Sequence, residues 1–81
     1  MIEKKTASQA IKDIRVEVGI THAKLAEKIG ANNAQVVQNL VMPGRNMRTD
    51  NLIKLADALG YDVILRNRVT DKEILIVKGE D

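Results

Sequence analysis

Glycines divide the first sixty residues of this chain into short segments, and this spacing restricts the fold more than any other feature. The segments that end at Gly19, Gly30 and Gly60, or before Pro43-Gly44, carry apolar residues at the i, i+3, i+4 spacing of a helix with one buried side. Glycine readily adopts the left-handed conformation that follows many helices, and proline cannot continue a helix. The pattern therefore predicts four short helices around one core.

The predicted helices begin at residues that can cap them and share apolar side chains. Their expected ranges are Ser8 to Val18 with Ser8 as the cap, His22 to Ile29 with Thr21 as the cap, Asn32 or Asn33 to about Val41, and Thr49 or Asp50 to Gly60. The side chains expected to be buried between the helices are Leu25, Ile29, Val36, Leu52 and Leu55.

After Gly60 the apolar spacing changes from that of helices to that of strands. Tyr61 to Asn67 and Glu73 to Lys78 are rich in Val, Ile and Leu and are separated by a polar run, which predicts a β-hairpin. Both faces of this hairpin are apolar, and one layer of helices can cover only one of them. A homodimer is therefore expected, with these hairpin residues in its interface: Val63, Ile64, Leu65, Ile74 and Ile76.

Composition excludes several classes of function. The 81 residues include no Cys, one His and a single aromatic residue, Tyr61. Thiolates and a second His are lacking for a metal site, and stacking surfaces for unpaired bases are lacking as well. The carboxylates are scattered and no Gly-rich phosphate loop occurs, so neither an enzyme nor a cofactor is expected. No secretory signal or membrane span is readable, and the expected location is the cytoplasm.

The segment from Thr21 to Val41 predicts a helix-turn-helix that reads double-stranded DNA. Its second helix presents amide side chains, which can hydrogen-bond base edges in the major groove, and Ala34 allows close approach. No acidic residue occurs from Lys28 through Thr49, so this stretch can approach phosphates without repulsion. The expected DNA contacts are His22, Asn32, Asn33, Ala34, Gln35, Gln38, Asn39, Arg45 and Arg48.

The residues THAKLAEKIGANNAQVVQNL, followed by RTDNLIKLADALG, resemble the helix-turn-helix of the phage repressor and Cro (Xre-type) regulators. The resemblance covers about Ile11 to Gly60. It implies a mainly α, lambda-repressor-like bundle of four to five helices that binds a palindromic operator as a dimer. It also implies that residues 1–60 form the DNA-binding part and residues 61–81 a dimerisation hairpin, within one compact domain.

Two further expectations follow from this resemblance. Leu40 stands where many members have a Glu that pairs with an Arg of the first helix, here Arg15, and Arg15 is expected to form an internal ion pair rather than a DNA contact. The terminal LGYDVILRNRV also resembles antitoxins and regulators with an appended β-element. The alternative to a repressor is therefore an antitoxin that binds a toxin protein and its own operator.

Overall fold

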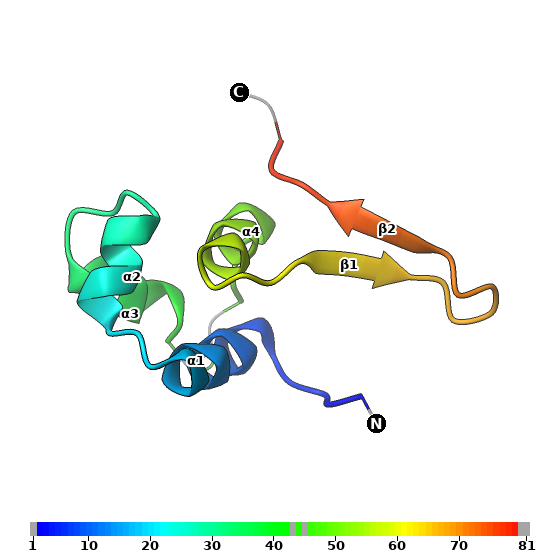
Figure 1. Cartoon of the computed structure of the whole chain (residues 1–81), viewed down its shortest axis with the longest axis horizontal. Coiled ribbons are helices and arrows are strands. Elements are labelled where there is room, and N and C mark those ends of the chain that lie inside the picture. Colours follow the sequence, from blue (N-terminus) through cyan, green and yellow to red (C-terminus); the bar gives the residue numbers. More distant parts are fainter. Residues whose placement is uncertain (1, 43, 45, 80–81) are drawn as a thin grey trace.

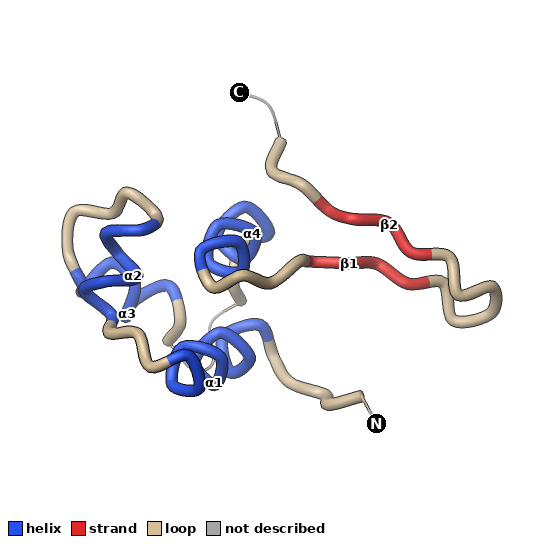
Figure 2. Tube along the Cα trace, viewed as in Figure 1, coloured by secondary structure: helices blue, strands red, loops and turns tan. Residues whose placement is uncertain are grey.

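The described part of the chain forms four helices followed by one two-stranded antiparallel sheet (Figure 1). A computed structural model describes residues 2–42, 44 and 46–79. Its elements are α1 (Ala7–Val18), α2 (His22–Lys28), α3 (Ala34–Leu40), α4 (Thr49–Ala58), β1 (Val63–Arg66) and β2 (Glu73–Ile76). Figure 2 shows the helices gathered at one end and the hairpin extending from them. The expected α-rich bundle with a terminal hairpin is confirmed, and none of the described helices is long and apolar enough to cross a membrane.

The start of each helix is set by a residue with extended backbone angles, and two of these residues differ from expectation. Thr6, not Ser8, caps α1, because its hydroxyl accepts a hydrogen bond from the N–H of Gln9 and Ser8 is buried inside the first turn. Arg48, not Thr49 or Asp50, precedes α4 and makes no side-chain cap bond. Thr21 and Asn33 cap α2 and α3 as expected, with bonds of 3.1 and 3.3 Å.

One apolar core lies between the four helices. Leu25 and Leu55 are fully buried, which confirms two predicted core positions, whereas Ile29 and Leu52 are half-buried against the core. The remaining core residues are Ile11, Ala26, Val37, Ala56 and Leu59. Each helix contributes only a few side chains to this core. The rotation of a helix therefore decides which of its apolar residues are buried.

Val36 was expected inside the bundle and lies at its surface, as does the apolar Val18 at the end of α1. Val36 is 36% exposed and Val37 is buried instead, because adjacent helix residues point about 100° apart and α3 turns Val37 toward the core. Val18 is 56% exposed, since α1 ends there and Ile20, beyond the left-handed Gly19, packs against the core.

The hairpin leaves the bundle at its first residue pair. The register pairs Val63 with Ile76, Ile64 with Leu75, Leu65 with Ile74 and Arg66 with Glu73, so the strands are shorter than predicted. Val63 and Ile76 are half-buried, and Val63 packs against the core that α4 helps to form. The other three pairs are exposed on both faces. The helices thus cover only the start of the hairpin and not the whole face that the sequence led us to expect.

Candidate nucleic-acid interface

The surface of α3 that points away from the core is polar and exposed. Val37 is fully buried and Leu40 half-buried, which fixes the rotation of the helix against α2. Gln35, Gln38 and Asn39 lie on the opposite side and are exposed. These three predicted contact residues are therefore brought together on one helix face.

The amides of this face differ in how far they are already hydrogen-bonded. Gln35 Nε2 donates to Asn39 Oδ1 at 3.1 Å, so these two side chains brace each other four residues apart. Asn33 Oδ1 accepts from the N–H of Val36, which commits this oxygen to the cap. Gln38 forms no side-chain hydrogen bond with any residue of the described ranges. Its donor and acceptor are both available, which is what bidentate pairing with an adenine edge requires.

The ends and flanks of α3 hold the other predicted residues of this surface. Asn32 is exposed in the turn before the helix, and Ala34 is half-buried at its first residue. Val36 is the exposed residue that the sequence interpretation missed, because the apolar stripe placed it inside. An exposed valine beside amides is the kind of side chain that can contact a thymine methyl group, so this face combines apolar and polar surface. Packing of Val37 and Leu40 against the core, which the spacing alone does not give, is what turns Val36 outward.

The cationic residues near α3 are exposed. The Arg48 side chain is 81% exposed, and its Nε lies 3.4 Å from Asp50 Oδ1. Lys24 and Lys28 on α2 are exposed, with Lys24 Nζ 3.5 Å from Glu27 Oε2. Pairs as exposed as these contribute little to stability, so both cations can exchange their partner for a phosphate. Arg45, also predicted as a contact, lies outside the described residues.

His22 and Arg15 occupy the junction between α1 and α2. His22 is half-buried at the first residue of α2, and burial, followed by the charge of Arg15, lowers its pKa. His22 is therefore neutral at pH 7 and offers a hydrogen bond rather than a charge. Arg15 Nη1 donates to the carbonyl oxygen of Ile20 at 2.8 Å, and no carboxylate of the described residues lies within 4 Å of it. The expected ion pair of Arg15 is thus wrong, because Leu40 supplies no carboxylate and the backbone takes its place.

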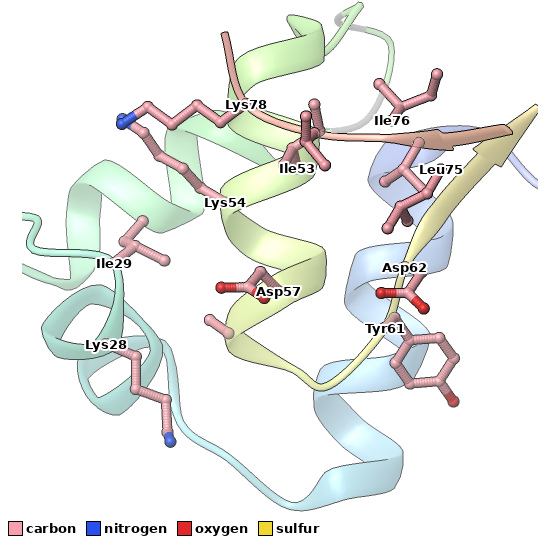
Figure 3. Close-up of a pocket in the computed structure, with 13 residues that line it drawn as sticks. Lys28, Ile29, Ile53, Lys54, Asp57, Tyr61, Asp62, Leu75, Ile76 and Lys78 are labelled. Carbon is pink, nitrogen blue, oxygen red and sulfur yellow. The ribbon is translucent and has the colours of Figure 1, made fainter. Parts of the chain in front are cut away.

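A groove of about 490 Å³ lies on another part of the surface, between α4, the end of α2 and the hairpin (Figure 3). Ile29, Ile53 and Leu75 contribute apolar side chains to it. Lys54 and Lys78 extend to the same side of the groove in Figure 3. Neither lysine forms an ion pair with a described residue, and the lining also includes Lys28, Asp57 and Asp62, so the groove combines an apolar lining with side chains of both charges.

Comparison with known proteins adds no relative to this description. No family model, no curated protein and no solved structure matches the chain. No group of three or more His, Cys, Asp or Glu residues in the described ranges is arranged to hold a metal ion.

Proposed function

We propose that this chain is a sequence-specific DNA-binding regulator, a repressor of the phage repressor and Cro type, that acts as a dimer in the cytoplasm. One observation carries the proposal: the exposed face of α3 gathers Gln35, Gln38 and Asn39 while Val37 anchors the opposite side in the core. Amides held on a rigid helix are the side chains that distinguish base pairs in the major groove.

The dimensions of α2 and α3 support the same function. The two helices are seven residues each, pack against each other and are joined by a turn that contains Gly30 at φ 75°. An α-helix with its side chains is about 10–12 Å in diameter, which fits a major groove about 12 Å wide. In this proposal α3 is the recognition helix of a helix-turn-helix and α2 lies across the DNA backbone.

Charge supports binding to a duplex rather than to an uncharged partner at this surface. The sequence from Lys28 through Thr49 has no acidic residue, and α3 lies within it. In this proposal the exposed Arg48 binds a phosphate, and the neutral His22 donates a hydrogen bond to another. Phosphate contacts would position the helix, and the amides of α3 would supply sequence preference.

Binding to labelled duplexes at several salt concentrations tests this function. We expect the affinity for mixed-sequence duplex to fall linearly on a log–log plot as salt rises. Gln38→Ala should weaken specific binding, whereas Gln9→Ala, at an exposed glutamine outside this face, should not. Gln9 is an exposed glutamine on α1 that, like Gln35, bonds a side chain four residues later. Absence of duplex binding, or binding that salt leaves unchanged, would reject the proposal.

The groove between α4 and the hairpin favours a second candidate function, that of an antitoxin whose partner is a toxin protein. Its apolar lining suits a segment with apolar side chains, and its three lysines outnumber its two aspartates, which favours acidic side chains in that segment. Lys54→Glu with Lys78→Glu should abolish binding of such a partner and leave DNA binding intact. Loss of DNA binding with retained partner binding would exclude the groove from this role.

A further inference from the structure

The edge of β1 that faces away from β2 carries unpaired backbone groups. In the described part of the chain, β1 pairs with β2 alone, and Figure 1 shows no strand along its other side. The N–H of Asn67 donates to the carbonyl oxygen of Lys72 at 2.8 Å, so these opposed residues form a hydrogen-bonded pair. In an antiparallel sheet, hydrogen-bonded and non-hydrogen-bonded residue pairs alternate along the strands. The backbone groups of Leu65 and Val63 therefore also bond β2. The N–H and C=O groups of Ile64 and Arg66 therefore point to the free edge.

Side chains along this edge combine apolar surface with opposite charges. Ile64 is 46% exposed and Leu65 is 61% exposed. Asp62 and Arg66 stand two residues before and two residues after Ile64, on the same side of the strand. Neither charge forms an ion pair with a described residue. The edge thus has a center that is apolar and two ends of opposite sign, which suits an inverted copy of itself.

We propose that two copies of this chain join β1 to β1 in antiparallel orientation, with a two-fold axis at Ile64. The result is a four-stranded sheet in the order β2-β1-β1-β2. In this register Asp62 lies opposite Arg66 of the partner subunit, twice by symmetry, and the outward backbone groups of both strands pair. The inference rests on the dimer of the proposed function and does not require DNA.

This register also accounts for the exposed apolar surface of the hairpin. Leu65 lies beyond the reach of its own helices, whereas Val63 packs against the core. Opposite Val63 of the partner subunit, Leu65 comes beside the other helical bundle and can be covered by it. An edge whose side chains remain exposed in one copy becomes internal in two.

The free edge of β2 is less suited to the same symmetry. An axis at Leu75, the residue that faces Ile64 in the hairpin, would place Lys72 opposite Lys78 of the partner subunit. Like charges directly opposite destabilise a strand pair, whereas the opposite charges at the β1 edge stabilise it. Charge therefore selects β1.

Single cysteines at the two candidate axes test the inference directly, because the chain contains no native Cys. A residue on such an axis faces its copy at a Cα separation of about 5.5 Å, within the usual disulfide range of about 4.4–6.8 Å. We expect Ile64→Cys to form a covalent dimer under mild oxidation. The matched Leu75→Cys, opposite it in the hairpin and similarly exposed, should remain a monomer with a free thiol on non-reducing denaturing gels. Cross-linking of Leu75→Cys in place of Ile64→Cys, or of neither, would overturn the proposal.

Charge reversal provides an independent measurement by sedimentation in the absence of DNA. Asp62→Arg should weaken dimerisation on the order of tenfold, and Asp62→Arg with Arg66→Asp should restore it. A double variant no better than the single one would overturn the register. A protein that cross-links through Ile64→Cys but binds no duplex would retain this inference and reject the DNA function. Operator binding without this cross-link would retain the function and reject the inference.

Discussion

The helical bundle and the hairpin contain the same kinds of apolar side chain, but the bundle buries them and the hairpin leaves most of them exposed. In the bundle, Leu25, Val37 and Leu55 have no exposed surface because four helices enclose them. In the hairpin, Leu65 and Ile74 face each other across the strands and are 61% and 51% exposed. The bundle completes its own core within one chain, whereas the hairpin needs a surface from outside. Apolar content therefore indicates a core in the first region, whereas in the second it supports the interface that we propose.

The largest expected effect comes from truncating a leucine in each region. Leu25→Ala should cost about 2–5 kcal/mol of unfolding free energy, because it leaves a cavity in a sealed core. Leu65→Ala should cost less than about 1 kcal/mol in the monomer, since its side chain is exposed. Urea denaturation at low protein concentration measures both. Equal losses would remove the distinction between the two regions.

The recognition surface should depend on the bundle and not on the hairpin. Gln38→Ala is expected to weaken binding to the preferred duplex by about 1–3 kcal/mol and to relax the preference at one base pair. Its sedimentation should stay unchanged, because Gln38 lies on α3 and far from the hairpin in the fold. Unchanged preference at every base pair would remove Gln38 from the contact surface.

Neighbouring valines test the rotation of α3. Val37→Ala should destabilise the bundle by about 1–3 kcal/mol, while Val36→Ala should change stability by less than about 0.5 kcal/mol. The difference arises because Val37 is buried and Val36 is 36% exposed. If thermal melts give the larger loss for Val36→Ala, α3 has the rotation that the sequence alone suggested.

These valines mark how far the sequence could predict the structure. Helix positions followed from glycines and apolar spacing, and the caps Thr21 and Asn33 were predicted because each precedes an apolar segment. Val36 and Val37 are adjacent and chemically identical, so spacing alone could not decide which faces the core; the packing of α3 against the other helices decides it. Thr6 and Ser8 are both good caps, and the choice between them depends on where the chain enters the bundle.

The candidate site was predicted in part for the same reason. Gln35, Gln38 and Asn39 were expected on one face, and any helix through them places them close together. The partner of Arg15 could not be predicted from the sequence. Arg15 bonds the backbone carbonyl oxygen of Ile20, and every residue has such a carbonyl, so no residue type marks the partner. The extent to which the helices cover the hairpin could not be predicted either. The spacing of apolar residues in a strand does not show how far the neighbouring helices extend along it.

Arg48 offers a change that should separate stability from binding within the bundle. Arg48 precedes α4 without a side-chain cap bond, so Arg48→Asn should stabilise the fold by about 1 kcal/mol. The same variant should weaken binding to all duplexes alike and reduce the salt slope by about one. Melting temperature and salt titration are the measurements. An unchanged salt slope would exclude Arg48 as a phosphate contact.

The smallest expected effect is a pH dependence confined to the bundle. Burial and Arg15 lower the pKa of His22 below its ordinary 6.5, so the unfolded chain binds this proton more readily. The free energy of unfolding is therefore unaffected by His22 above pH 6.5, and it decreases as pH falls from 6.5 toward the lowered pKa of the folded state. Denaturation between pH 7 and 5 should show this loss in the native protein and not in His22→Gln, which lacks the chain's only histidine. Identical profiles would place His22 in solvent.

Selection of bound duplexes from a random pool at physiological salt tests the central claim most directly, because it examines the bundle and the hairpin together. If α3 reads the major groove and the hairpins join two copies, the selected duplexes will carry inverted half-sites. Their centers should lie about 34 Å apart, one turn of DNA, or a multiple of it. Selection of no sequence, or of a single half-site without its inverted repeat, would contradict the account.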